Sequence, residues 1–189
     1  EIRIQYYVGQ NRMPLAIDTV KEVLALLEIP LTDELPADLD VTRLDDLEPM
    51  TDPRYLAAMR ILMSSMPAVY IAAPELLPLV SFTMIRLTVR HGESRIACYA
   101  YSLYALIMAG VLGEFDVGFE FAQLALRVQQ KVEAVELESK VYALVYIFVH
   151  HWKRHLRDTL DGLLHGVKIG IATGDVEYAG YNAVHYSTF

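Results

Sequence analysis

His150, His151 and His155 form a small cluster of metal-ligating side chains. His151 and His155 are four residues apart, and side chains at that spacing share one face of an α-helix, where two imidazoles can hold a zinc ion. No HExxH sequence surrounds them, and the intervening Lys153 and Arg154 would repel a cation. Basic side chains at a helix end also interact with its terminal carbonyl groups. We therefore predict no metal ligands and no cofactor, and keep a helical metal-dependent enzyme using His151 and His155 as the alternative function.

Glycine recurs every four residues at Gly162, Gly166, Gly170 and Gly174. No phosphate-binding GxGxxG or GxxxxGK[ST] sequence accompanies this spacing. Interior glycines cost a helix about 0.5–1 kcal/mol each relative to alanine, so a compensating contact is expected. The spacing predicts a helix face that packs closely against a neighbour.

Nucleophilic catalysis has little support in the sequence. Ser81, Ser94 and Ser102 lie in apparent helices without a GxSxG turn, and Cys98 has no evident base and only apolar neighbours. We predict a buried Cys98 thiol and no catalytic residue. The acidic stretch lacks the DxDxDG order of a calcium loop.

A group of methionines and a group of tyrosines could each line a binding groove, but core packing is the simpler interpretation. Met59, Met63 and Met66 form an apolar stripe at helical spacing. Tyrosines that fill space between helices keep their hydroxyl groups at the rim. The tyrosines concerned are Tyr99, Tyr101, Tyr104, Tyr142 and Tyr146.

The net charge of −8 is concentrated in one segment. Residues 31–52 contain eight acidic side chains and one arginine, which gives −7, so the rest of the chain is nearly neutral. A nucleic-acid binder needs a basic face, and this class is therefore excluded. We expect the acidic segment to be a solvated connection or a docking surface for a basic partner.

Hydrophobic residues make up 54% of the chain, which raises the question of a membrane. The longest uncharged run, Ile96–Gly113, reaches only the lower limit for spanning a bilayer, and three tyrosines and a serine interrupt it. We predict a buried helix there and no membrane insertion. A single cysteine permits no disulfide within the chain, in keeping with a cytoplasmic location.

Helix signals dominate the chain, and no pair of strands is predicted. Pro14 and the apolar stripe after it predict a helix that ends by Pro30. Asp52 and Pro53 are an N-cap and a first-turn proline, which predict a helix to about Ile71. Other helices are predicted over residues 41–47, 74–91, 94–111, 116–130, 135–152 and 158–172, and from residue 175 onward.

An offset of about 41 residues relates these helices. Gly92, Glu133 and Gly174 end three of them at this spacing, and Tyr101 lies one period before Tyr142. Matching positions in the second helices are Leu77, Gly118 and Thr159; Val80, Phe121 and Gly162; and Met84, Ala125 and Gly166. Such periods are typical of stacked helical hairpins. We predict an all-α, tetratricopeptide-like solenoid, a right-handed superhelix of antiparallel hairpins at 53–91, 94–131 and 135–173.

Several short segments carry a family resemblance. They are Met50-Thr51-Asp52-Pro53, Leu56-Ala57-Ala58-Met59, Tyr70-Ile71-Ala72-Ala73-Pro74, Gly92 with Ser94, Gly118-Phe119-Glu120-Phe121, Leu124-Ala125-Leu126, and Gly174-Asp175 before Glu177-Tyr178. In this order, across nearly the whole chain, they resemble the helical-repeat region of large multidomain signalling kinases. The resemblance implies a full-length protein with a Ser/Thr kinase domain, an AAA/STAND-type ATPase, a GAF sensor and a histidine-kinase output. No kinase or Walker motif lies within these 189 residues, so no catalytic residue is carried over.

We therefore predict one continuous repeat domain cut at both ends. Residues 1–29 end a preceding hairpin, residues 30–51 form an acidic connection, and residues 52–189 are stacked hairpins. The expected function is a noncatalytic scaffold in signal transduction that binds a protein partner or the flanking domains of its own chain. Repeat ends expose apolar faces, so we also expect the isolated segment to form homo-oligomers.

Overall fold

The computed structural model describes residues 1–34 and 39–189, so Pro36 and Asp38 of the acidic segment lie outside the described residues. The described part of the chain is all-α, as predicted, and its only extended pairing is an isolated bridge between Pro49 and Glu93. The chain forms two compact units. Unit 1 consists of Glu1–Leu39 and Leu47–Ile96, and unit 2 of Asp40–Asp46 and Ala97–Phe189.

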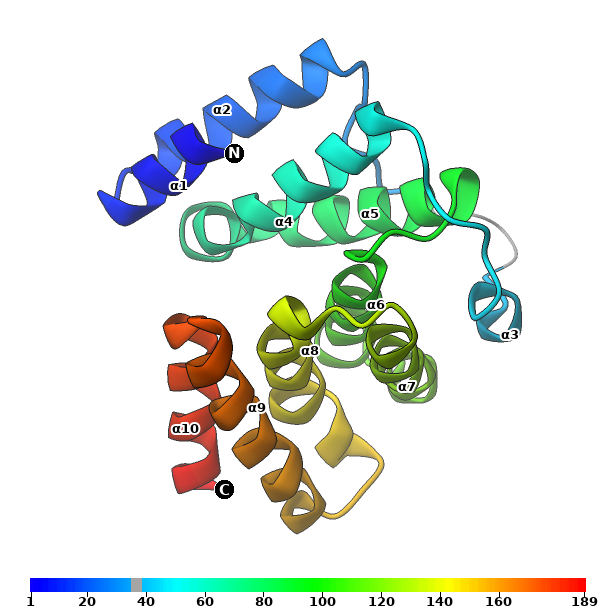
Figure 1. Ribbon diagram of the computed structural model, residues 1–189, viewed down its shortest axis with the longest axis vertical. Coiled ribbons are helices and arrows are strands. Elements are labelled where there is room, and N and C mark those ends of the chain that lie inside the picture. Colours follow the sequence, from blue (N-terminus) through cyan, green and yellow to red (C-terminus); the bar gives the residue numbers. More distant parts are fainter. Residues whose placement is uncertain (35–38) are drawn as a thin grey trace. The chain divides into compact units, whose positions relative to one another are not determined.

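Unit 1 contains helices α1 (Ile2–Gly9), α2 (Met13–Leu26), α4 (Pro53–Ala72) and α5 (Leu77–His91) (Figure 1). Each helix packs against the next one in this series, and α1 also contacts α4. The Asp52 carboxylate accepts a hydrogen bond of 2.8 Å from the Arg54 backbone N–H, which confirms the predicted cap of α4. Pro78 lies in the first turn of α5, and the predicted start at Pro74 is a separate 3₁₀ turn, Pro74–Leu76. Helix α1 carries no cap or proline signal and was not predicted.

The end of α5 is tied to the acidic segment by backbone contacts. Glu93 donates its backbone N–H to the Glu48 carbonyl and accepts from the Met50 N–H, each at 2.7 Å. Gly92 ends the helix, as predicted, with a φ of +100°, and a Cβ there would lie 2.3 Å from the Glu48 carbonyl oxygen. Only glycine fits this position because both the backbone angle and the available space exclude a side chain.

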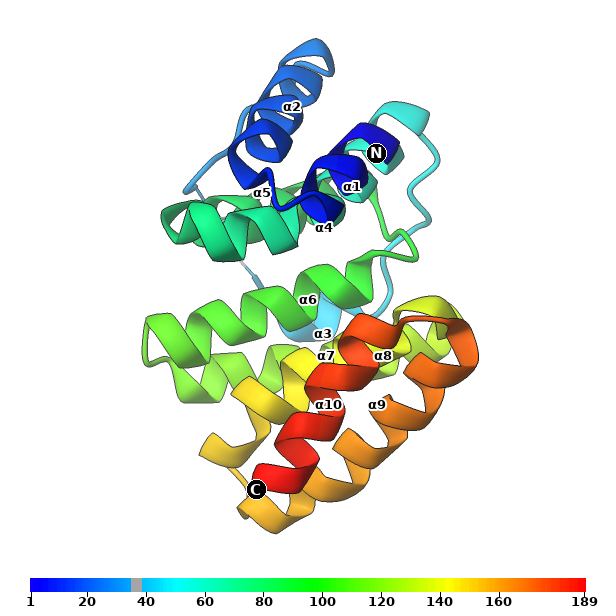
Figure 2. The same cartoon turned by 90° about the vertical axis from the view of Figure 1, so that its left-hand side faces the viewer.

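Unit 2 contains α6 (Ala97–Leu106), α7 (Phe115–Lys131), α8 (Val135–Phe148), α9 (Leu160–Thr173) and α10 (Val176–Thr188). Consecutive helices pack together, and α8 also contacts both α6 and α10. Figure 2 shows α9 and α10 side by side. Helix α3 (Val41–Leu44) belongs to this unit and confirms the predicted short helix in the acidic segment. The Arg127 guanidinium holds the Asp45 carboxylate at 2.7 Å, and this ion pair attaches α3 to α7.

Two helices of unit 2 end earlier than the sequence pattern predicts. Helix α6 changes to a π-helical turn at Ile107–Val111. Helix α8 ends at Phe148, and His150–Trp152 form a 3₁₀ turn instead of continuing it. The Trp152 indole N–H donates to the Phe148 carbonyl at 3.1 Å, which satisfies a helix-terminal acceptor that the continued helix would have used.

The second helix of each helix pair ends on a residue with positive φ. These residues are Glu28 after α2, Gly92 after α5, Glu133 after α7 and Gly174 after α9. The last three are the positions spaced 41 residues apart in the sequence. The sequence period therefore marks positions of positive φ after the second helix of a pair, although ψ is 175° at Gly92 and 10° at Gly174.

Most of the predicted core residues are buried, while Met63 of the methionine stripe is half-buried. Every residue from Ala97 to Ala105 in α6 is buried, and the Tyr104 ring packs edge-on against Phe121 of α7 at a centroid distance of 4.5 Å. Met59, Met66 and the Cys98 thiol are also buried, as predicted. In the described part of the chain, α4 is the helix long and apolar enough to cross a membrane, and 44% of its most apolar window is buried.

The glycine stripe of α9 lies at close helix contacts, which confirms the predicted tight packing. A Cβ built on Gly162 would lie 2.4 Å from the Tyr146 ring of α8. A Cβ on Gly166 would lie 2.6 Å from the Asn182 side chain of α10, and one on Gly170 would lie 2.6 Å from the Ser139 hydroxyl. Gly174 is the left-handed C-cap of the helix.

We expect Gly166→Ala to lower the free energy of unfolding by about 1–3 kcal/mol, because the added methyl group overpacks a filled contact. Asn182 cannot easily move away, since its side-chain amide hydrogen-bonds to Ser139 and Tyr178. Urea unfolding followed by Trp152 fluorescence measures this change in unit 2.

The matched control is Gly180→Ala in α10, where a Cβ meets no atom within 4 Å. This exposed helical position should gain about 0.5–1 kcal/mol from the substitution. Equal effects of the two substitutions would contradict close packing at Gly166.

Candidate functional site

The two histidines proposed as an alternative metal pair do not share a helical face. His151 lies in the 3₁₀ turn after α8, and His155 adopts an extended conformation before the next 3₁₀ turn, Leu156–Thr159. The His155 Nδ1 accepts a hydrogen bond of 3.1 Å from the Arg157 backbone N–H. The helix ends at Phe148, so the four-residue spacing no longer aligns the two imidazoles.

The described residues contain no group of three or more His, Cys, Asp or Glu side chains that could hold a metal ion. The serines considered as nucleophiles are all buried. Ser81 in α5 and Ser102 in α6 are buried, and Ser94 is also buried but precedes α6 instead of lying in a helix.

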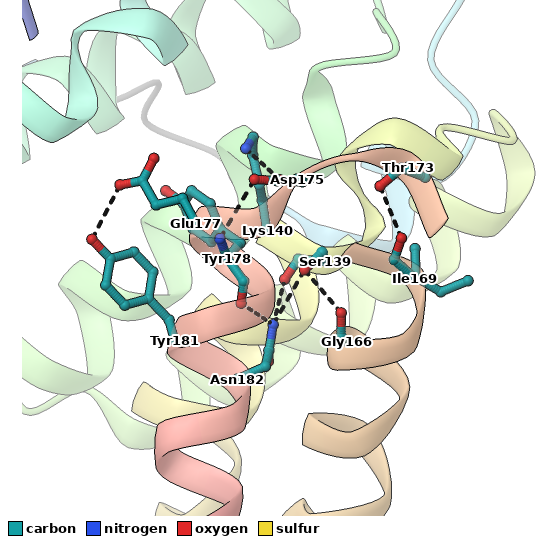
Figure 3. A network of polar contacts seen from close by, with 10 residues as sticks. All are labelled: Ser139, Lys140, Gly166, Ile169, Thr173, Asp175, Glu177, Tyr178, Tyr181 and Asn182. Carbon is teal, nitrogen blue, oxygen red and sulfur yellow. Dashed lines mark hydrogen bonds and ion pairs between the residues drawn. The ribbon is translucent and has the colours of Figure 1, made fainter. Parts of the chain in front are cut away.

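A polar network joins α8, α9 and α10 (Figure 3). The Ser139 hydroxyl donates to the Gly166 carbonyl at 2.9 Å. The Asn182 side-chain N–H groups donate to the Ser139 carbonyl at 3.1 Å and to the Tyr178 carbonyl at 2.8 Å. Ser139 and Asn182 are both fully buried. These bonds satisfy polar groups at the contacts that the glycines open, so the network has a structural role.

Charged and phenolic groups continue this network near its edge. The Lys140 ammonium pairs with the Asp175 carboxylate at 2.5 Å and lies 4.2 Å from the centre of the Tyr178 ring. Burial raises the pKa of Tyr178 to about 12, with a smaller opposing effect from its hydrogen bond with Tyr99. Burial also raises the pKa of Tyr99. Phenols with such pKa values stay protonated at neutral pH and cannot serve there as bases.

Exposed apolar side chains gather where α7 begins and α8 ends. The Phe115 and Trp152 rings stack with their centroids 4.5 Å apart, although they remain 38% and 49% exposed. Val111, Leu112 and Leu156 are further large apolar residues exposed in the adjoining turns. We call Phe115, Trp152 and these three aliphatic residues the aromatic patch, after the two stacked rings. Its position was not predicted, because the sequence does not indicate that Phe115 and Trp152 meet.

Charged and aromatic side chains next to Phe115 and Trp152 in the chain make contacts of their own. Lys153 forms an ion pair with Asp116, and the Arg154 guanidinium lies 5.6 Å from the centre of the Phe119 ring. The His150 ring lies 5.0 Å from that of Tyr146. An apolar centre with a polar rim is the arrangement found at protein–protein interfaces.

The tyrosines considered as a groove do not form one. Tyr99, Tyr101 and Tyr104 are buried in α6, as core packing predicts. Tyr142 and Tyr146 are half-buried in α8, and the centroids of their rings lie 5.4 Å apart.

Comparisons with protein-family models, with curated proteins and with solved structures each found no match.

We expect the His150 imidazole to make the stability of unit 2 depend on pH. Burial lowers the pKa of His150, with further lowering from Arg154 and His151 and an opposite, smaller effect of Asp158. The unfolded chain therefore binds more protons than the folded chain between the two pKa values, and stability rises with pH through that range. We expect the free energy of unfolding to fall as the pH drops from 7.5 to 5.5.

In the His150→Gln variant this fall should be smaller, because position 150 no longer binds a proton. The measurement is the urea midpoint of Trp152 fluorescence at pH 7.5, 6.5 and 5.5. His185→Gln is the control, since His185 is exposed on α10. A pH dependence in His150→Gln as steep as in the unchanged chain would contradict this account.

Proposed function

We propose that the chain is a noncatalytic helical-repeat scaffold that binds a protein partner through the aromatic patch. Trp and Phe side chains are normally buried, and residues that concentrate binding energy at interfaces are rich in Trp, Tyr and Arg. The stacked pair of Phe115 and Trp152 keeps large aromatic surfaces in solvent. This exposed pair is the observation that carries the proposal.

The proposal also includes a repeat architecture, in which the helices form stacked pairs. It assigns the helix pairs within each unit to right-handed, tetratricopeptide-like stacking of antiparallel hairpins. Two observations support it: contacts between next-but-one helices, α1 with α4, α6 with α8 and α8 with α10, and positive φ after the second helix of each pair. Stacked hairpins of this kind expose extended surfaces for partners.

The resemblance to multidomain signalling kinases suggests where such a scaffold works. We infer a cytoplasmic signal-transduction protein in which this region connects catalytic domains, so that the partner is a flanking domain of the same chain or a separate protein. The kinase and ATPase activities would then belong to those flanking domains.

The binding proposal is tested with the chain immobilised and offered the flanking polypeptides of its own reading frame as separate purified fragments. We expect one fragment to bind, and Phe115→Ser to weaken its binding by roughly tenfold or more, because aromatic residues at interface centres contribute at least about 1.4 kcal/mol. Phe115 is preferred to Trp152 because the Trp152 indole also bonds to the helix end.

Ile71→Ser is the matched control, since Ile71 is 62% exposed at the end of α4 in unit 1. Binding by the unchanged chain and by Ile71→Ser, with loss in Phe115→Ser, supports the proposal. Failure to bind the flanking fragments and any cellular protein, or equal binding by all three chains, would refute it.

The apolar face of α10 predicts self-association. Val176 and Val184 are 73% and 58% exposed on this helix, and Tyr181 and Tyr186 are also exposed. Light scattering should show a mass that rises with concentration, and Val184→Lys should reduce this rise while Ile71→Lys should not. A monomer at every concentration would contradict the prediction.

A further inference from the structure

Basic side chains from two helices line a cavity of about 250 Å³ in unit 1. It lies where the chain leaves α2, α4 begins and α5 ends, elements that Figure 1 labels. Its polar lining includes Arg54, Arg86, Arg90, His91 and Glu28. With a neutral imidazole these groups leave an excess of two positive charges in the cavity wall.

Two of the arginines are held in place by backbone carbonyl groups. Arg54 donates its Nε–H to the Leu27 carbonyl at 2.5 Å, and Arg86 donates an Nη2–H to the Pro30 carbonyl at 2.9 Å. Each guanidinium has five N–H donors, so both retain donors for another acceptor. Their positions are fixed before any ligand arrives, which lowers the entropic cost of binding.

Arg90 is not held in place by a backbone carbonyl group as Arg54 and Arg86 are. Its side chain is exposed, and within residues 1–34 and 39–189 no carboxylate lies within ion-pair distance of its guanidinium. A basic residue at the end of α5 interacts favourably with the helix dipole, but that effect is small at an exposed site. Its charge instead adds to the positive potential of the cavity.

The pKa values of Arg86 and His91 are lowered mainly by burial, and the positive charges around them add to this effect. Burial lowers the pKa of Arg86, Arg90 lowers it further, and Glu34 acts in the opposite direction. The pKa of His91 is lowered first by burial and then by Arg90 and Arg54, against the effect of Asp52. A bound anion would offset the repulsion among these groups.

An aromatic contact fixes one side of the cavity. The Tyr55 and His91 rings stack with centroids 3.5 Å apart and planes 14° apart. His91 therefore presents its ring edge in a defined orientation beside the arginines.

We propose that this cavity is an anion-binding site for the dianionic phosphate group of a phosphate monoester. The lining carries three guanidinium groups against one carboxylate, and guanidinium groups with fixed N–H donors bind phosphate oxygens with directional, charge-assisted hydrogen bonds. The site lies in unit 1 and is independent of the aromatic patch in unit 2.

The first test uses inorganic phosphate as the probe. The chain is titrated with phosphate at constant ionic strength, with chloride as the balancing salt, and the His91 and arginine side-chain NMR signals are followed. Saturable shifts of these signals are expected. Arg90→Gln should weaken binding roughly tenfold, the value of one charge-assisted hydrogen bond.

Arg90 is chosen because its exposed side chain caps no carbonyl in the described structure, so the variant should fold normally. Arg12→Gln is the control, since it removes the same charge from an exposed position of unit 1 outside the cavity. Shifts that do not saturate, or equal phosphate affinity in the unchanged chain and in Arg90→Gln, would overturn the proposal.

A second set of titrations identifies the source of the phosphate group. A phosphoserine peptide, the same peptide without phosphate, and a nucleoside monophosphate are compared with inorganic phosphate. Tighter binding of the phosphopeptide assigns the site to modified proteins, and tighter binding of the nucleotide assigns it to a small ligand. Binding of the unphosphorylated peptide as tightly as the phosphopeptide would contradict a phosphate site.

Discussion

Close packing of neighbouring helices, made possible by glycine, is the constraint on which unit 2 depends. A Cβ on Gly118 would lie 2.9 Å from the Ala105 carbonyl oxygen, and Gly162 and Gly166 have equally little space beside Tyr146 and Asn182. These contacts position α7 on α6 and α9 between α8 and α10. The helix ends that carry the aromatic patch follow from this packing, since Phe115 begins the helix that Gly118 brings close to α6.

Polar groups complete the same contacts. The fully buried Ser139 hydroxyl needs a partner, and the Gly166 carbonyl accepts its hydrogen bond where the glycine lets the helices approach. Asn182 in turn bonds to Ser139 and to the chain of its own helix. Packing and hydrogen bonding are therefore coupled, and a substitution that adds volume also disturbs a buried network.

Short sequence patterns predicted the boundaries of many helices. They do not predict contacts between residues that are far apart in the sequence. N-cap residues, prolines and glycines mark where helices begin and end. The sequence therefore identified Asp52 as an N-cap and Gly92 and Gly174 as helix ends, as the structure confirms. At the end of α8 the Trp152 indole N–H bonds to the Phe148 carbonyl, a local side-chain contact that the 41-residue period does not predict. The pairing of Phe115 with Trp152 and the collection of Arg54, Arg86 and Arg90 around one cavity likewise require the folded chain.

The most direct test of this account is native-state hydrogen exchange of unit 2. If the glycine contacts and the Ser139–Asn182 network join α8, α9 and α10 into one cooperative element, the buried amides of these helices should exchange with a common opening free energy. Exchange of the central amides of α10, around Ala179 and Asn182, at the rate of an unstructured peptide while α8 stays protected would contradict it.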